Sequence, residues 1–196
     1  MITGSAPTLA TRVFGAREGS AAIVQNVALA VLGALALWIS AKIKVPFYPV
    51  EMTLQGMVVL LIGAAYGWRL GGATVALYLA QGAMGMPVFT GTPEKGIGIA
   101  YMMGPTGGYL LGFLVAAVMT GWLVERIGTR NVFLVGGAML ASVAVMFALG
   151  LLWLGTLFGW DKPILDWGLY PFVLGDLTKV ALAACLTAGI ARVVRK

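Results

Sequence analysis

Two oppositely charged side chains stand inside the last apolar segment of the chain, Asp176 and Lys179. An ionisable group at the centre of a bilayer costs at least ~2.5–3.5 kcal/mol, and such groups usually mark functional sites. Their i, i+3 spacing places both on one face of a helix, where each offsets the charge of the other. The pair would offer an acceptor and a donor to a polar ligand; the alternative is a structural ion pair near the helix end.

A second group of polar residues opens another apolar segment, with Thr53 followed by Gln55. The amide of Gln55 could bind a ligand or a neighbouring helix, and the sequence leaves both open. Glu51 and Glu94 belong to connecting segments, where we expect solvated charges. Several aromatic residues are expected at the same end of the apolar segments as these polar groups: Phe47, Tyr48, Phe89, Tyr101 and Tyr109. Apolar and aromatic surface with few polar groups suits a small amphiphilic ligand.

Residue types exclude several other chemistries. The chain has no histidine and a single cysteine, Cys185, which excludes an intramolecular disulfide, thiolate zinc clusters and histidine-based catalysis. It has no phosphate-binding Gly-x-x-x-x-Gly-Lys-Ser/Thr loop, no metalloprotease motif and no Gly-x-Ser-x-Gly elbow. We therefore expect a binding or transport protein rather than an enzyme, with no metal and no cofactor.

The elements that must position these residues are membrane spans. Of 196 residues, 60% are hydrophobic and only 10% are charged, a balance outside the range of soluble domains. The apolar runs predict an all-α integral membrane protein with six transmembrane helices. These are expected at about residues 20–41, 53–66, 106–125, 131–154 and 171–193, with one more that follows a tight turn at 67–71 and continues to 84. Residues 1–19 would form a mobile cytoplasmic tail, and residues 20–196 a single membrane domain.

The charges predict how the spans are oriented. The net charge of +6 is spread over helix ends rather than along one stripe, which argues against nucleic-acid binding. One group of basic residues falls on the side of both termini: Arg12, Arg17, Arg69, Arg126, Arg130, Arg192, Arg195 and Lys196. The other group falls on the opposite side: Lys42, Lys44, Lys95 and Lys162. Because cytoplasmic loops carry the excess of Lys and Arg, both termini should be cytoplasmic.

The connection at residues 85–110 is rich in glycine and proline between two apolar runs. Irregular backbone at membrane depth is tolerated only where protein buries it or where it lines a cavity. We therefore expect this connection to form a wall of a binding site at the outer end. On the first span, Ala30 and Ala34 flank Gly33 as a small-xxx-small pair, which would serve either internal packing or the docking of a partner helix.

Four segments, taken in order, resemble biotin-uptake proteins of the BioY type, the substrate-binding S components of energy-coupling-factor (ECF) transporters. The segments are VPFYPVEMTLQ at 45–55, GMPVF at 85–89, GPTGGYLLGF at 104–113 and PFVLGDLTK at 171–179. The resemblance extends over about residues 25–191. Glu51 is a departure, because many members are expected to carry an uncharged residue there.

The resemblance implies a six-helix bundle of the bacterial cytoplasmic membrane that binds biotin with high affinity near the outer face and serves its uptake. It implies that Asp176 and Lys179 contact biotin. It leaves their individual roles open; our hypothesis is that Asp176 accepts from a ureido N–H and that Lys179 completes a polar network with the ring or the carboxylate. Further contacts from the matching motifs are Thr53, Gln55, Phe89, Thr106 and Tyr109. It also implies that the face of Ala30 and Ala34 docks on a transmembrane coupling subunit, which works with two ATPase subunits.

Two other functions remain open from the sequence. One is the capture of a different small vitamin by the same kind of site. The other, of a different class, is a membrane enzyme acting on lipid, for which the sequence offers no catalytic group.

Overall fold

The computed structural model describes residues 8–15, 17–45 and 48–194. The expected tail residues 1–7, Phe47 of the aromatic group, and the basic residues Arg195 and Lys196 lie outside this part of the chain. The helices are α1 (Leu9–Phe14), α2 (Gly19–Lys42), α3 (Gln55–Ala83), α4 (Gly98–Met102), α5 (Gly107–Ile127), α6 (Val132–Phe158), α7 (Ile164–Gly168) and α8 (Tyr170–Val193). Two short antiparallel strands, β1 (Lys44–Val45) and β2 (Met52–Thr53), form a hairpin between α2 and α3.

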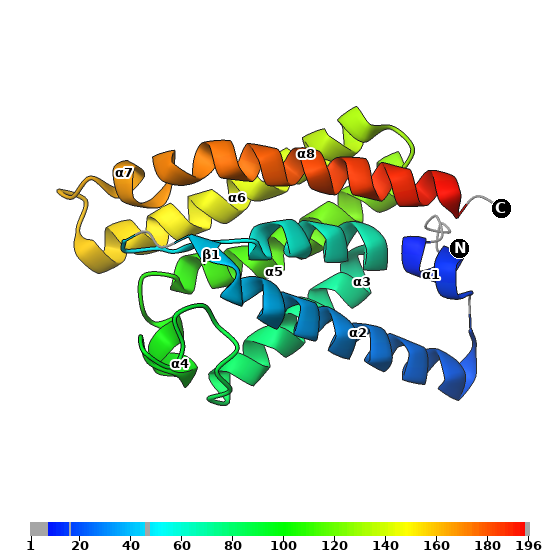
Figure 1. Cartoon of the computed structure of the whole chain (residues 1–196), viewed down its shortest axis with the longest axis horizontal. Helices are drawn as coiled ribbons and strands as arrows, with labels where there is room; N and C mark the ends of the chain where they lie inside the picture. The colour runs from blue at the N-terminus through cyan, green and yellow to red at the C-terminus, as the bar shows by residue number, and fades with distance from the viewer. Residues whose placement is uncertain (1–7, 16, 46–47, 195–196) are drawn as a thin grey trace.

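Five helical stretches in the described residues are long and apolar enough to cross a membrane: α2, α3, α5, α6 and the stretch through α7 and α8. The helical membrane architecture is therefore confirmed. Helix α5 packs against both α3 and α6, and α2 packs against α3 (Figure 1). Helix α1 and the C-terminal end of α8 lie at one end of the bundle, whereas β1, α4 and α7 lie at the other (Figure 1).

The helix expected at residues 53–66 and the one expected to follow the turn at 67–71 are the two arms of α3. They meet at Gly67, whose φ of 79° and ψ of 176° are not helical. This backbone conformation is open almost only to glycine. The backbone N–H of Trp68, directly after this break in the helix, donates to the carboxylate of Glu125 on α5 at 3.1 Å. The arms come close enough that a methyl group on Gly71 would lie 3.2 Å from the Cα of Gly63.

Several short elements were not predicted. The segment expected as a polar tail contains α1, which packs against α3 and buries Leu9 and Ala10. Helices α4 and α7 and the β1–β2 hairpin lie in segments expected to be irregular loops. Elements this short have too few residues to establish a hydrophobic period, so only their tertiary contacts reveal them.

We predict that Gly67→Ala destabilises the protein by about 1–3 kcal/mol, because alanine is strained at this φ and ψ and its methyl group would collide with Glu125. The measurement is thermal unfolding of the purified protein in detergent. Gly137→Ala is the matched control, since a methyl group there meets nothing within 4 Å. Equal unfolding temperatures for the two variants would contradict the role assigned to Gly67.

Candidate binding site

A cavity of about 60 Å³ lies among the helices at the end of the bundle opposite α1. The segment leading into α3 contributes Val50, Glu51, Met52 and Thr53, and α8 contributes Phe172, Asp176 and Lys179. The remaining walls come from the first turn of α3, from the connection 84–106 and from α5 and α6. Most of the lining is apolar or aromatic, with a few polar groups placed among it.

Asp176 and Lys179 form an ion pair on the cavity side of α8. The Lys179 ammonium donates to Asp176 Oδ1 at 2.6 Å, and the two side chains are only 12% and 15% exposed. Their predicted placement on one helix face is confirmed. Local pairing removes most of the cost of burying either charge, while Asp176 retains acceptor capacity and Lys179 further N–H donors. A direct ligand contact stays a prediction.

Gln55 begins α3 and is 2% exposed, with its side chain on the cavity. Its backbone N–H donates to the hydroxyl of Thr53 at 3.3 Å, which fixes the first turn of the helix. Its side-chain nitrogen Nε2 forms no hydrogen bond of good geometry among the described residues, although the amide lies beside the hydroxyl of Tyr78. Leaving a buried donor unpaired costs about 1–3 kcal/mol, so this amide is a natural partner for an acceptor on a ligand.

Thr106 and Tyr109, at the start of α5, also line the cavity. The hydroxyl of Tyr109 donates to the carbonyl of Gly168 at 2.7 Å, and its ring meets Phe147 edge to face at 6.0 Å between centroids. This hydrogen bond ties α5 to α7. Tyr109 therefore presents its ring to the cavity while its hydroxyl serves the fold.

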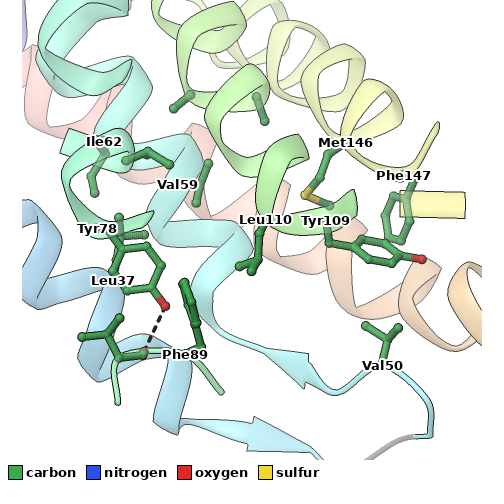
Figure 2. Packing of buried hydrophobic residues seen from close by; sticks show 14 of the residues in the cluster. Leu37, Val50, Val59, Ile62, Tyr78, Phe89, Tyr109, Leu110, Met146 and Phe147 are labelled. Atoms are coloured by element: carbon green, nitrogen blue, oxygen red, sulfur yellow. Dashed lines mark hydrogen bonds between the residues drawn. The ribbon is translucent and has the colours of Figure 1, made fainter. Parts of the chain in front are cut away.

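Phe89 does not line the cavity. Its ring is 1% exposed, stacks on Tyr101 at 5.1 Å and meets Tyr78 edge to face at 5.5 Å. Figure 2 shows Phe89 in the hydrophobic core, beside Tyr78 and Leu37. Tyr101 lines the cavity instead, with Phe89 behind it, and burial raises the pKa of the Tyr101 hydroxyl to about 12.

The aromatic lining from α6 and α8 was missed in the sequence. Phe147 and Phe172 line the cavity together with Met146, and their rings are 6.2 Å apart. In the sequence they are indistinguishable from the many apolar residues of a membrane span. Only their position opposite Tyr109 gives them a role.

The face of Ala30 and Ala34 turns toward the interior of the bundle. Ala34 is 1% exposed and belongs to the main core, and Ala30 is partly buried. A methyl group on neighbouring Gly33 would lie 2.6 Å from the side chain of Thr74 on α3. Of the two alternatives left open, the structure thus favours internal packing over partner docking.

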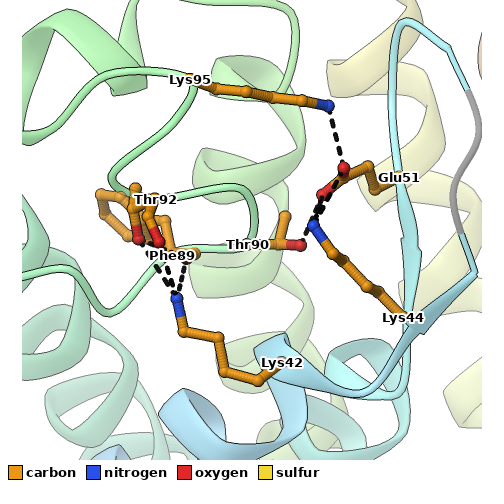
Figure 3. Close-up of polar contacts among 7 residues, drawn as sticks. All are labelled: Lys42, Lys44, Glu51, Phe89, Thr90, Thr92 and Lys95. Atoms are coloured by element: carbon orange, nitrogen blue, oxygen red, sulfur yellow. Dashed lines mark hydrogen bonds and ion pairs between the residues drawn. The ribbon is translucent and has the colours of Figure 1, made fainter.

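The expectation that Glu51 is a solvated loop charge is wrong. Its side chain is 8% exposed and its carboxylate accepts from Lys95 at 2.9 Å, Thr90 at 2.7 Å and Lys44 at 3.1 Å (Figure 3). Burial alone would raise the pKa of this carboxyl, but the hydrogen bonds from Lys95, Thr90 and Lys44 outweigh it and lower the pKa to about 2. Glu51 is therefore ionised at every physiological pH.

This fold and site define a helical membrane protein with a cavity suited to a small amphiphilic molecule. The sequence model of the BioY family matches residues 8–196, and the chain belongs to that family. It is 40% identical over 184 residues to the biotin transporter BioY of Rhodobacter capsulatus, covering 86% of this chain and 94% of the relative. It is 36% identical over 148 residues to the biotin transporter BioY of Thermotoga maritima, covering 76% and 85%.

A solved structure shares the fold. The crystal structure of the S component for biotin from an ECF-type ABC transporter superposes with a TM-score of 0.77 and 24% identity, covering 90% of this chain and 95% of that one.

We predict a pH dependence for the contribution of Glu51 to stability. Its pKa is lowered from 4.5 to about 2 on folding, so the stabilisation is fully present above pH 4.5 and is lost as pH falls toward 2. The difference in unfolding temperature between the wild type and Glu51→Gln should be constant from about pH 5 to 8 and shrink in acid. Glu94→Gln, at an exposed residue of the same connection, is the control. A difference that persists undiminished near pH 2 would contradict this assignment.

Proposed function

We propose that this chain is the substrate-binding component of a biotin uptake system, with an outward-facing pocket. The observation that carries the proposal is the coincidence of a BioY family match over residues 8–196 with a cavity that offers both charges of a buried ion pair and an unpaired amide donor. Relatives named as biotin transporters support biotin as the ligand and transport, rather than catalysis, as the activity.

In this proposal the chain crosses the membrane six times, through α2, the two arms of α3, α5, α6 and α8. Arginines at the α1 end of the bundle make that end cytoplasmic, and lysines near the cavity mark the outer end. Arg69 lies over the ring of Trp68 at 4.9 Å, and Arg126 over Trp122 at 3.7 Å, as expected for anchors at a membrane interface. Residues 20–196 would act as a single membrane domain.

Biotin matches the chemistry of the lining. Its ureido ring carries two N–H donors and one carbonyl acceptor, the sulfur-containing ring fused to it is apolar, and its aliphatic chain ends in a carboxylate. Asp176 would accept from a ureido N–H, and Lys179 would donate to the ring carbonyl or to the carboxylate. Gln55 would donate through Nε2. Hydroxyls of Thr53 and Thr106 and the rings of Tyr101, Tyr109 and Phe172 would complete the wall, with Phe89 supporting Tyr101 from behind.

We further propose that partners supply the energy for uptake. The chain carries no phosphate-binding loop, so ATP hydrolysis would take place on two ATPase subunits, joined to this chain by a transmembrane coupling subunit. The assembly would lie in the cytoplasmic membrane of a bacterium. The S component for biotin in the solved structure is named as part of an ECF-type ABC transporter, which supports this proposal.

We predict that biotin binds the detergent-solubilised protein and that Asp176→Asn and Lys179→Ala each weaken binding by roughly 10- to 150-fold, because each removes a charge-assisted hydrogen bond worth about 1.5–3 kcal/mol. Isothermal titration calorimetry measures the affinities. Asp161→Asn is the control, since Asp161 pairs with Lys162 at 2.9 Å on an exposed surface.

The outcomes separate the claims. Heat from another vitamin but none from biotin would contradict the choice of ligand. Unchanged biotin affinity in both α8 variants would contradict the site, while family membership would stand. A chemical product released from lipid would favour an enzyme.

We also predict that Gln55→Leu separates stability from binding. Leucine removes the buried donor Nε2 and its contact with the Tyr78 hydroxyl, which keeps its hydrogen bond to the carbonyl of Val88, so the unfolding temperature should change little. Biotin affinity should fall by roughly tenfold, since an acceptor on the ligand loses its partner. Gln81→Leu, on the other arm of α3, is the control. A loss of stability together with unchanged affinity would assign Gln55 to helix packing.

A further inference from the structure

The basic side chains of the described chain are sorted by type between the two ends of the bundle. The arginines lie in or beside α1, the kink of α3, the turn from α5 to α6 and the end of α8: Arg12, Arg17, Arg69, Arg126, Arg130 and Arg192. The lysines of residues 8–15, 17–45 and 48–194 lie toward the cavity end: Lys42, Lys44, Lys95, Lys162 and Lys179. Membrane topology rules count lysine and arginine alike, so they do not explain a sorting by type.

The two residue types differ in what they bind. The guanidinium group of arginine is planar and weakly hydrated, it stacks on aromatic faces, and its fork of N–H donors matches two oxygens of a phosphate group. The ammonium group of lysine is a compact and strongly hydrated charge. An end of the bundle that carries arginine in place of lysine is therefore suited to phosphate at an apolar boundary.

Two of these arginines lie over tryptophan rings. The guanidinium carbon of Arg126 is 3.7 Å from the centre of the Trp122 ring, one turn earlier on α5, and that of Arg69 is 4.9 Å from the centre of the Trp68 ring. The two indoles are 42% and 37% exposed, so they belong to the outer surface of the bundle. Tryptophan at such positions lies at the level of lipid headgroups. A guanidinium group on a ring uses its face, which leaves the N–H groups at its edge for another partner.

Both stacks leave the bundle at one contact between α3 and α5. A methyl group on Gly121 would collide with the backbone of Gly67 and Trp68, so the two helices touch there through their backbones. The N–H of Trp68 donates to Glu125 at 3.1 Å across the same contact. We call the side chains of Trp68, Arg69, Trp122 and Arg126 the arginine junction.

The arginine junction has no anion of its own. Among the described residues, neither Arg69 nor Arg126 forms an ion pair, and both are exposed. Glu125 lies between them in sequence, and its carboxylate accepts from the backbone of Trp68. The edges of both guanidinium groups are thus available to an anion from outside the protein.

We propose that the arginine junction binds the headgroup of an anionic phospholipid, with Arg69 and Arg126 donating N–H groups to the phosphate oxygens. Trp68 and Trp122 hold the two guanidinium groups at the membrane boundary. The acyl chains would lie along α3 and α5, both of which are apolar enough to cross a membrane. The six arginines outnumber Glu18 and Glu125 at this end, which favours an anionic headgroup over a zwitterionic one.

A bound headgroup would also stabilise the fold. Arg69 follows the kink at Gly67, and Arg126 belongs to the last turn of α5. A phosphate group held by both would tie the second arm of α3 to α5 next to a backbone conformation that only glycine adopts easily. Lipid that binds the folded protein in this way raises its stability by mass action.

Lipid retention tests the proposal. The detergent-solubilised protein is incubated with equal amounts of phosphatidylglycerol and phosphatidylcholine and purified again by gel filtration, and the retained lipids are counted by mass spectrometry. The wild type should retain phosphatidylglycerol over phosphatidylcholine by about three- to tenfold. Arg69→Gln and Arg126→Gln should each lower this preference at least about twofold. Arg126→Lys keeps the charge without the planar fork, so it should also retain less than the wild type.

Arg130→Gln is the matched control, because it removes the same charge at the same end from a side chain that lies on no ring in the described chain. It should keep most of the preference. Equal retention of the two lipids by the wild type would overturn the proposal. A loss in Arg130→Gln as large as in Arg126→Gln, or full retention by Arg126→Lys, would also overturn it, since net charge alone would then explain the binding.

Thermal unfolding gives a second measurement. Phosphatidylglycerol should raise the unfolding temperature of the wild type by about 2–6 °C, and phosphatidylcholine should raise it less. The shift should be lost in Arg126→Gln and in Trp122→Leu, which keeps both arginines and removes the ring beneath one of them. Unfolding without added lipid checks that these variants fold, as expected for substitutions at exposed positions.

Glycerol phosphate distinguishes a lipid site from a site for free phosphate. It should produce no shift at the same concentration, because it has no acyl chains to lie along the helices. An equal shift from glycerol phosphate would contradict a lipid as the occupant. None of these measurements uses biotin, so their outcome is independent of the function proposed above.

Discussion

A charged pair inside an apolar helix constrains everything around it. Asp176 and Lys179 lie 2.6 Å apart and nearly buried, in a helix whose outer side is otherwise apolar. Such a pair is tolerated only where each charge has a partner and the pair faces protein or a cavity rather than lipid. The rotation of α8 about its axis is thereby fixed, and with it the side of the bundle that holds the cavity.

Close helix packing then sets the distances within the site. A methyl group on Gly63 would lie 2.5 Å from the carbonyl oxygen of Ala117, so α3 and α5 touch through their backbones. The first arm of α3 carries Gln55 at its start, and α5 carries Thr106 and Tyr109 at its own. Because both helices begin at the same end of the bundle, their first turns converge on the ion pair of α8.

The sequence predicted those features that follow from local physics. Apolar length located α2, α5, α6 and α8 to within a few residues, because the bilayer demands such length whatever the tertiary fold. The i, i+3 spacing placed Asp176 beside Lys179, because residues three apart lie on the same face of any α-helix. Glu51 was misjudged because its partner Lys95 is 44 residues away, and only the folded connections bring the two together. An aromatic contribution to the cavity wall was predicted, but Phe89 was expected to line the cavity where the structure has Tyr101. A connection without regular secondary structure has no period from which the direction of each ring could be predicted.

The two polar ends of the cavity differ in charge, and this difference bears on the kind of ligand it admits. At α8 one carboxylate meets one ammonium group, so that end is close to neutral. At the hairpin the single carboxylate of Glu51 meets the ammonium groups of Lys44 and Lys95, which leaves an excess of one positive charge. Lys42 adds another close by, on the carbonyls of Phe89 and Thr92, but Glu94 interacts with it, so the excess remains one positive charge. An anion approaching this end of the bundle meets a positive potential before it reaches the cavity, and the low-dielectric surroundings extend that attraction. These lysines would therefore favour the approach of a carboxylate-bearing ligand over that of a cationic one.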